Sequence, residues 1–300
     1  MSMGVRVLTR PLGLRWSHMS RLSTTVTPET AIGVPVDKHL KVTASSTRLP
    51  VVSQAEVIRA RQESPTVRCI TLKLHNPAFS FKAGQWVDMF IPGMEIVGGF
   101  SMFSPPDQLA QDGTIDLGIK FSRWPPAFWV HDQCRIGNMV SLRAGGDFHY
   151  APEAGDDPYD LLLIGGGVGV NPLTSMFLHA TSLYLQHQEC EEEYKPGRIL
   201  LLYSARTYQE LLYKNQMNDT AASTPGVEVQ YFTTREPPPD PTLATYGHIS
   251  QEVLQKAVNS LNTSKLKSFI CGPPPMIESI NQLLLQSGLT QDQIFYEKWW

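Results

Sequence analysis

The segment that most constrains the fold of this 300-residue chain is residues 159–178, which read YDLLLIGGGVGVNPLTSMFL. Its apolar run at residues 161–164 is typical of a strand covered on both faces of a parallel sheet. A run of glycines follows at once, and glycine lets backbone N–H groups come close to a ligand. We expect Asn171 to cap a helix whose first residue is Pro172, where proline costs no hydrogen bond. A strand, a glycine turn and a helix N-terminus in this order predict a site for phosphate anions.

The glycine turn departs from the ordinary dinucleotide fingerprint, Gly-x-Gly-x-x-Gly. Pro172 stands where the last glycine would fall, and no acidic residue follows about 20 residues later at a strand end, where the usual ribose contact lies. A turn that only packs the helix against the strand is the alternative interpretation. Both interpretations remain open on this segment alone.

The first 28 residues differ from the rest in composition. They hold four arginines and several Ser and Thr, and no acidic residue precedes Glu29. This is typical of a mitochondrial transit peptide, so we expect residues 1–28 to be removed on import, with the matrix as the destination. A disordered basic tail is the alternative. Residues 29–50 have low hydrophobicity and no clear period, which indicates a linker.

Composition excludes several classes of partner. A net charge of -3 with 42% hydrophobic residues gives no reason to expect nucleic acid or a charged membrane surface. No apolar run reaches the roughly 18 residues that span a bilayer, so no transmembrane segment is expected. The four cysteines lie far apart and lack metal-ligand spacing, so we predict no metal site.

Two kinds of pattern divide the chain near residue 156. Short strand-like segments with Pro and Gly turns predict an antiparallel β-barrel over residues 51–155. Strands and helices then alternate, which predicts a doubly wound parallel α/β sheet over residues 156–300. The barrel strands are expected at 57–60, 67–74, 85–91, 100–103, 114–120 and 139–143, with a loop at 104–113 and a helix at 127–134. The later strands are expected at 161–164, 199–203, 227–232, 267–271 and 293–296, with helices at 172–187, 209–217, 250–260 and 274–287.

Four motifs along residues 50–300 resemble those of the ferredoxin–NADP⁺ reductase superfamily. They are FKAGQWV at 81–87, the Phe-Ser pair at 100–101, the GGGVGVNPLTS loop at 165–175 and CGPPPM at 271–276. The resemblance implies a flavin-binding (FR-type) barrel that holds FAD, or FMN as the alternative. It also implies a second domain that binds NAD or NADP. Hydride would pass from nicotinamide to flavin, and electrons would go on to a separate acceptor, because the chain shows no haem or iron–sulfur module.

The flavin-binding residues implied by the resemblance are Phe100, which would pack on the ring, and Ser101, whose hydroxyl would lie near the reactive nitrogen. The alternative is a strand with one buried Phe and one exposed Ser. The chain departs from the family at Gly98, where the family has an arginine that neutralises flavin phosphate. It departs again at Ala127, where a hydroxyl usually begins the helix facing the diphosphate.

Nearby groups could bind flavin phosphate in place of the missing arginine and hydroxyl. Helix N–H groups after Trp124 could still meet a phosphate, and Lys120 and Arg123 are nearby cations. Both cations are otherwise ordinary solvated surface residues.

The resemblance also implies a nucleotide site in which Cys271 lies near the nicotinamide ring. A buried cysteine at a strand end is the alternative, and no basic neighbour marks Cys271 as a nucleophile. Arg206 and Arg235 each follow a strand end and could hold the 2′-phosphate of NADPH; two surface arginines are the alternative, so the choice between NADH and NADPH stays open. The other residues predicted to bind the nucleotide are Gly165, Gly166, Gly167, Val168, Gly169, Val170, Pro172, Gly272, Pro273 and Met276.

The C-terminal residues complete the predicted site. Trp299 and Trp300 could cover the flavin, and Glu297 could assist proton transfer. Packing of the last strand against the barrel is the alternative. The leading hypothesis is therefore a mitochondrial NAD(P)H:acceptor oxidoreductase that uses flavin, with Ser101, Cys271 and Glu297 nearest the chemistry. The rival is a nucleotide-binding or sensor protein with a degenerate flavin site, favoured by Gly98 and Ala127.

Overall fold

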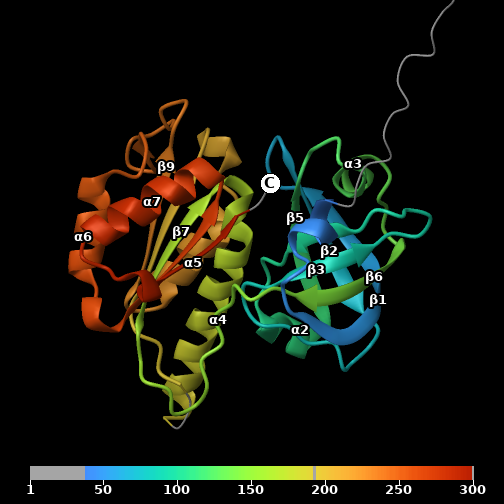
Figure 1. The fold of residues 1–300 in the computed structure, drawn as a ribbon, viewed down its shortest axis with the longest axis horizontal. Helices are drawn as coiled ribbons and strands as arrows, with labels where there is room; N and C mark the ends of the chain where they lie inside the picture. The colour runs from blue at the N-terminus through green and yellow to red at the C-terminus, as the bar shows by residue number, and fades with distance from the viewer. Residues whose placement is uncertain (1–37, 192–193, 299–300) are drawn as a thin grey trace, which may run out of the picture. The chain divides into compact units, whose positions relative to one another are not determined.

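The computed structural model describes residues 38–191 and 194–298. The predicted transit peptide, residues 29–37 of the predicted linker, and Trp299 and Trp300 lie outside these described residues. The described part contains an antiparallel barrel followed by a parallel α/β sheet, which confirms the predicted fold class (Figure 1).

The barrel is a six-stranded antiparallel sheet with strand order β4-β3-β6-β1-β2-β5. Its strands are β1 (Arg48–Gln62), β2 (Val67–Leu74), β3 (Trp86–Phe90), β4 (Gly98–Ser101), β5 (Thr114–Lys120) and β6 (Met139–Gly145). Met102, just after β4, forms an antiparallel bridge with Leu117 of β5 and so nearly closes the barrel. Alternate side chains such as Val57, Leu72 and Leu142 point inward and are fully buried, as expected for strands with one core face.

Three short elements of the barrel domain differ from the predictions. Helix α1 (Lys38–Val42) and the first residues of β1 lie within the predicted linker, because His39 is buried against the barrel. Helix α2 (Pro106–Asp112) lies in the predicted loop and buries none of its residues, so it has no apolar face to reveal it. Helix α3 (Pro125–Asp132) begins two residues before the predicted helix.

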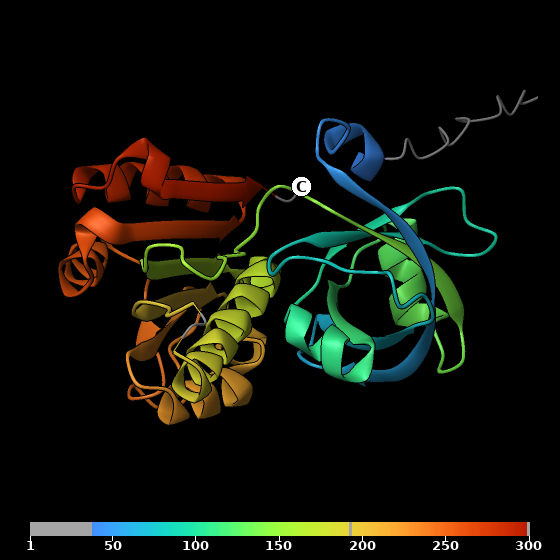
Figure 2. The same ribbon diagram turned by 90° about the horizontal axis from the view of Figure 1, so that it is seen from below.

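The second sheet has strand order β10-β9-β8-β7-β11-β12, and all its pairs are parallel. Its strands are β7 (Asp160–Gly166), β8 (Ile199–Ala205), β9 (Val227–Thr233), β10 (Thr245–Tyr246), β11 (Leu266–Gly272) and β12 (Ile294–Lys298). Its helices are α4 (Val170–Glu189), α5 (Lys214–Ser223), α6 (Gln251–Ser260) and α7 (Pro274–Gln286). The 3₁₀-helices are η1 (Gly167–Gly169), η2 (Tyr208–Glu210), η3 (Thr263–Lys265) and η4 (Gln291–Gln293). β7 alternates its side chains between two cores: Leu161 and Leu163 pack with α4 and α5, and Leu162 and Ile164 with α6 and α7 (Figure 2).

Two predicted helix boundaries were wrong. Helix α4 begins at Val170, and Asn171 makes no capping bond because its side chain is used elsewhere. The helix predicted at 209–217 is instead η2 followed by α5, which begins at Lys214. Tyr213 separates them with a left-handed φ of 57°, a conformation that interrupts a helix.

The barrel and the parallel sheet share an apolar core that runs along α4. Phe103 and Ala83 of the barrel belong to the same buried cluster as Val170 and Phe177 of α4, and Figure 2 shows α4 between the sheet and the barrel. Polar contacts fix the register of this interface. Ser175 Oγ, for example, donates a buried hydrogen bond of 2.7 Å to the carbonyl oxygen of Ser104. A second buried bond, from Nδ2 of Asn171 to the carbonyl oxygen of Gly118, holds the start of α4 against β5 of the barrel.

Candidate functional site

The glycine turn and the proline-rich turn lie against each other at the carboxyl ends of β7 and β11. These strands pair directly, with Cys271 opposite Gly165. A Cβ atom at Gly169 would lie 2.4 Å from the carbonyl oxygen of Cys271, and a Cβ at Gly166 would lie 3.0 Å from Cδ of Pro273. Glycine is required at both positions because the two backbones approach so closely. Both turns thus open into one cleft, where open α/β sheets bind ligands.

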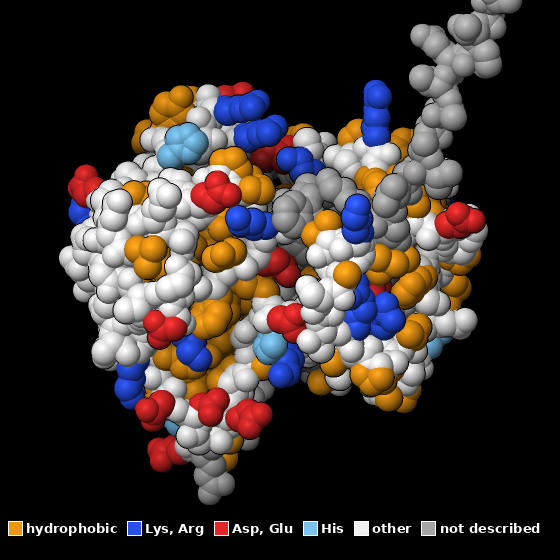
Figure 3. Space-filling model, viewed as in Figure 1, with side chains coloured by type: hydrophobic (Ala, Val, Ile, Leu, Met, Phe, Trp, Pro, Cys, Tyr) orange, Lys and Arg blue, Asp and Glu red, His pale blue; other side chains and the backbone are white. Residues whose placement is uncertain are grey.

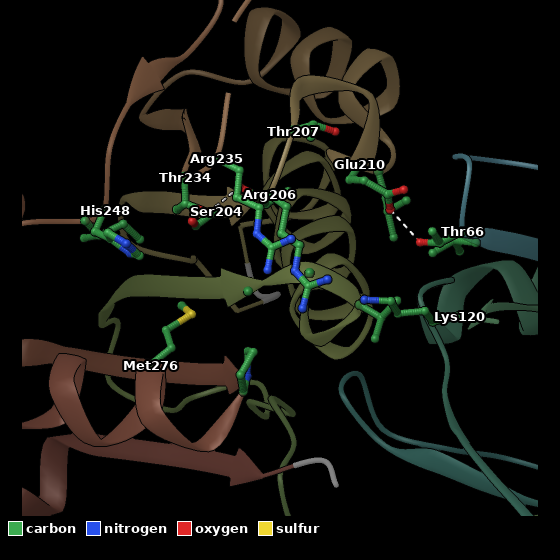
Figure 4. A pocket seen from close by; sticks show the side chains of 18 of the residues that line it. Thr66, Lys120, Ser204, Arg206, Thr207, Glu210, Thr234, Arg235, His248 and Met276 are labelled. Atoms are coloured by element: carbon green, nitrogen blue, oxygen red, sulfur yellow. Dashed lines mark hydrogen bonds between the residues drawn. The ribbon is translucent and has the colours of Figure 1, made fainter. Parts of the chain in front are cut away.

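The larger of two pockets in this cleft has a volume of about 860 Å³ and is lined by both turns. Its apolar wall comes from Ile249 and from the start of α7, including Met276 and Ile280. Its charged wall follows β8 and β9. Figure 4 shows Arg206 and Arg235 extending side by side into the pocket, with Lys120 pointing toward them from the barrel. In the view of Figure 3, Lys and Arg side chains gather around the opening between the sheet and the barrel.

A backbone hydrogen bond sets the two arginines beside each other. The N–H of Arg235 donates a 2.9 Å hydrogen bond to the carbonyl oxygen of Arg206, which places the two residues side by side. Among residues 38–191 and 194–298, neither guanidinium forms an ion pair. The nearby carboxylate of Glu210 instead accepts hydrogen bonds from Thr66 Oγ1 at 2.7 Å and Ser64 Oγ at 3.0 Å. Two exposed guanidinium groups without a carboxylate suit a phosphate.

The smaller pocket lies on the barrel side and has a volume of about 440 Å³. Phe100 and Ser101 of β4 line it together with His39. Val168 of the glycine turn and Lys120 at the end of β5 line both pockets. The two pockets therefore share a wall, and a ring in one can lie next to a ring in the other.

His39 is a site residue that the sequence analysis missed. Its Nε2 lies 2.8 Å from Oδ1 of Asp88, whose side chain is fully buried, and Arg48 and Arg143 pair with the other oxygen at 2.9 and 2.6 Å. Burial alone would raise the pKa of Asp88, but the hydrogen bonds from these three side chains lower it to about 2. A sequence signal for these partners existed, namely the single aspartate, Asp88, within the otherwise apolar strand β3. A buried carboxylate needs hydrogen-bonding partners, so Asp88 indicated that basic side chains pack against it.

Both glycines of β4 accommodate aromatic rings. A Cβ at Gly99 would lie 2.0 Å from Nδ1 of His39. A Cβ at Gly98 would lie 2.6 Å from the Phe100 ring and 3.0 Å from Cβ of Pro126. The space beside Gly98 is thus filled by Phe100 and by the start of α3.

The first turn of α3 is a poor phosphate site. Pro125 and Pro126 are its first two residues and have no N–H to donate. The N–H of Phe128 bonds to the carbonyl oxygen of Trp124 within the helix, so Ala127 offers the only amide of this turn outside that bond. The sequence predicted that this helix start could still offer N–H groups to a phosphate, but its first two residues are prolines and offer none. The residues present thus fit a flavin ring better than flavin phosphates.

The three residues that were predicted to lie nearest the chemistry differ in their access to the pockets. Ser101 lines the smaller pocket. Cys271 is completely buried, and this burial, together with the charge of Glu297, raises the pKa of its thiol well above the ordinary value. Glu297 is opposite Cys271 in the β11–β12 register and lines neither pocket. Trp300 lies outside the described residues.

The predicted nucleotide residues fall into two groups. Those that line the pockets are Gly166, Gly167, Val168, Arg206, Arg235, Pro273 and Met276. Those that shape the two turns without lining a pocket are Gly165, Gly169, Val170, Pro172 and Gly272. Within the described ranges no His, Cys, Asp and Glu cluster could hold a metal ion. None of the helices in this part of the chain is long and apolar enough to cross a membrane.

The barrel followed by the parallel sheet defines the fold of ferredoxin–NADP⁺ reductase-like proteins. Solved structures share this fold. The cytochrome P450 reductase GcoB from Amycolatopsis superposes with a TM-score of 0.68 at 24% identity, covering 84% of this chain and 71% of that one. A ferredoxin–NADP⁺ reductase from Neisseria gonorrhoeae with bound FAD and NADP gives 0.65 at 19% identity, covering 82% and 98%.

Sequence comparison identifies the family more closely. The model of the oxidoreductase NAD-binding domain matches residues 163–282. Oxidoreductase NAD-binding domain-containing protein 1 from Danio rerio is 42% identical over 267 residues, which cover 87% of this chain and 97% of the relative. This chain therefore belongs to the family of oxidoreductase NAD-binding domain-containing protein 1. The resemblance stated from the motifs is confirmed.

Proposed function

We propose that the protein is an NAD(P)H:acceptor oxidoreductase in which hydride passes from a nicotinamide in the larger pocket to a flavin in the smaller one. The observation that carries this proposal is the shared wall of Val168 and Lys120 between the two pockets. Hydride transfer needs the two reacting rings in contact, and adjoining pockets permit that arrangement. The flavin supplies the redox chemistry, and the chain supplies position and charge.

The larger pocket has the features that a dinucleotide requires. Its volume of about 860 Å³ suits a ligand of that size. Arg206 and Arg235 supply cations for phosphate, and the wall around Met276 supplies apolar surface for a base. The solved reductase from Neisseria gonorrhoeae, which shares this fold, has FAD and NADP bound.

The proposed roles of the barrel residues follow from their places. Phe100 and Ser101 line the smaller pocket, so they are placed to pack on a flavin ring and to hydrogen-bond its edge. Electrons leave to a separate acceptor. Cys271 is not proposed to act as a nucleophile, because its thiol is buried and its raised pKa keeps it protonated.

The test is anaerobic spectroscopy of the purified protein with flavin added in excess. Bleaching of the flavin band near 450 nm (roughly where oxidised flavin absorbs) by NADH or NADPH supports the proposal, because the cofactor performs the redox step. Val168→Trp places a large ring in the shared wall and should stop bleaching. Val52→Trp, at an exposed barrel position outside both pockets, is the matched control and should leave bleaching unchanged.

A second function, nucleotide binding without flavin chemistry, is favoured by a separate observation. Gly98 and Ala127 lack the groups that the superfamily uses on flavin phosphate, and α3 begins with two prolines. Such a sensor would bind NAD(P)H, for example by quenching of tryptophan fluorescence, and would bleach no added flavin. The same anaerobic experiment therefore separates the two functions.

We also propose that the protein is imported into mitochondria and loses residues 1–28. The support is the basic, acid-free composition of that segment. N-terminal sequencing of protein isolated from mitochondria should begin near residues 25–30. Intact Met1 on that protein would contradict cleavage.

A further inference from the structure

Among the described residues of the two pockets, the cations that could hold a phosphate gather in the larger pocket. Arg206 and Arg235 face that pocket alone, and Lys120 is shared between the two. On the flavin side, Gly98 has no side chain, and the space beside it is filled by the Phe100 ring and Pro126. Arg123, which the sequence suggested as a substitute, is exposed and does not line the smaller pocket.

Apart from Lys120, the basic side chain that lines the smaller pocket is already hydrogen-bonded. His39 lines the smaller pocket, but its Nε2 is bound to Asp88 at 2.8 Å, and Arg48 and Arg143 are bound to the same carboxylate. The first turn of α3 offers one amide, that of Ala127. On this side a flavin diphosphate would therefore meet Lys120 and one helix amide, and the rest of its charge would face solvent.

The ring-binding part of the pocket is intact by contrast. Phe100 offers an aromatic side chain, Ser101 a hydroxyl, and Val168 an apolar wall toward the larger pocket. Apolar and aromatic surface with a few polar groups is what a planar heterocycle requires. The pocket thus recognises the part of the flavin that riboflavin, FMN and FAD have in common.

We infer that the flavin is an exchangeable substrate of this protein, held by its ring and not anchored by its phosphates. This inference rests on the proposed function and names the acceptor that the function left open. In the reaction the dihydronicotinamide loses a hydride, its two electrons and one hydrogen join the flavin ring, and solvent supplies one proton. The products are NAD(P)⁺ and a dihydroflavin that diffuses away to reduce other molecules.

The test is a comparison of riboflavin, FMN and FAD as ligands of the whole protein, by quenching of flavin fluorescence. Because each charge-assisted hydrogen bond to a phosphate is worth roughly tenfold or more in affinity, an anchored flavin would show a steep order from FAD to riboflavin. We expect the three dissociation constants to agree within about threefold, since the phosphates make few such bonds. We also expect flavin to leave the protein on desalting, and excess riboflavin to be reduced by NAD(P)H over many turnovers.

A gain-of-function variant makes the test sharper. Ala127→Ser restores the hydroxyl at the start of α3 and should improve FMN and FAD over riboflavin by about fivefold, the value of one hydrogen bond. Ala127→Cys has nearly the same size without a strong donor and is the control.

Two other outcomes distinguish failure of the exchangeable-flavin inference from failure of the proposed oxidoreductase function. FAD that stays bound through desalting and binds far more tightly than riboflavin would overturn the inference and leave the proposed oxidoreductase intact. Failure of all three flavins to bind, with NAD(P)H still bound, would overturn both.

Discussion

Nδ2 of Asn171 donates a hydrogen bond of 2.7 Å to the carbonyl oxygen of Gly118, and so joins the first turn of α4 to β5 of the barrel. The hydroxyl of Tyr213 donates to Oδ1 of the same amide at 2.9 Å. These polar groups are buried, and Gly118 lacks a side chain because the Tyr213 hydroxyl fills that space. The contact sits beside Val168 and Lys120, so it sets how the two pockets meet.

Removal of the Tyr213 hydroxyl should therefore destabilise the protein. Tyr213→Phe leaves the buried Oδ1 of Asn171 without its donor, which we expect to lower the free energy of unfolding by about 1–2 kcal/mol. Urea denaturation measures this change. Tyr246→Phe, at a side chain that is 58% exposed, is the control and should have no effect. Equal stability of the two variants would show that the Tyr213 bond contributes nothing.

Asp88 should make stability depend on pH in acid. Its pKa is lowered to about 2 in the folded protein, because hydrogen bonds from His39, Arg48 and Arg143 outweigh its burial. A carboxyl with a depressed folded pKa stabilises the fold above its unfolded pKa of about 4, and this contribution is lost as the pH falls from about 4 to 2. The shift corresponds to roughly 2–3 kcal/mol.

Asp88→Asn tests this linkage in unfolding measurements between pH 7 and pH 2. The difference in unfolding free energy between the wild type and the variant should be largest near neutral pH and should shrink below about pH 4. Glu252→Gln is the control, because the pair of Glu252 with Lys256 is exposed and screened by solvent. A difference that stays constant down to pH 2 would contradict the assigned direction of the shift.

Gly99 and His39 should be coupled in stability. A Cβ at Gly99 would lie 2.0 Å from Nδ1 of His39, so Gly99→Ala must displace the imidazole from Asp88. We expect a loss of about 1–3 kcal/mol, typical of overpacking a filled site. In the His39→Ala background the same substitution should cost little. A double-mutant cycle by chemical denaturation measures the coupling, and additive losses would show that the imidazole does not occupy the space beside Gly99.

The parts of the fold that the sequence predicted are those encoded locally. The apolar run of β7 and the glycines after it predict a strand and a turn without reference to any distant residue. Likewise, residues of the turn before α7 were predicted to bind the same nucleotide as the glycine turn, and parallel strands bring their carboxyl ends to one edge. The close approach of the Gly169 backbone to the carbonyl group of Cys271 agrees with that expectation.

The parts that escaped prediction depend on partners far along the chain. His39 meets Asp88 across 49 residues, so a segment of low hydrophobicity that resembled a linker is docked on the barrel. Asn171 has the side chain of a helix cap, but Tyr213, 42 residues away, and Gly118 compete for its amide. Local propensity cannot reveal such competition.

Arg235 should discriminate between the two nicotinamide nucleotides. It lies beside Arg206 in the larger pocket without a carboxylate partner, so its guanidinium is free to bind a 2′-phosphate. Arg235→Ala should weaken NADPH by about tenfold to a hundredfold and NADH much less, as expected for one charge-assisted contact. Binding is measured by fluorescence titration, with the exposed Arg59→Ala as the control. Equal losses for both nucleotides would remove Arg235 from the phosphate site.

The cysteines should differ in reactivity toward thiol reagents. Cys190 is exposed, and Cys69, Cys134 and Cys271 are buried. Burial raises the pKa of Cys69 to about 12 and that of Cys271 well above its ordinary value, so neither forms a thiolate near neutral pH.

At pH 8 the native protein should therefore react rapidly at Cys190 alone, and Cys190→Ser should abolish the rapid phase. Denaturant should expose the remaining thiols. If Cys271 reacted in the native protein and NAD(P)H protected it, its side chain would face the nicotinamide directly. Cys271 would then be part of the nucleotide site and not only a buried residue at the end of β11.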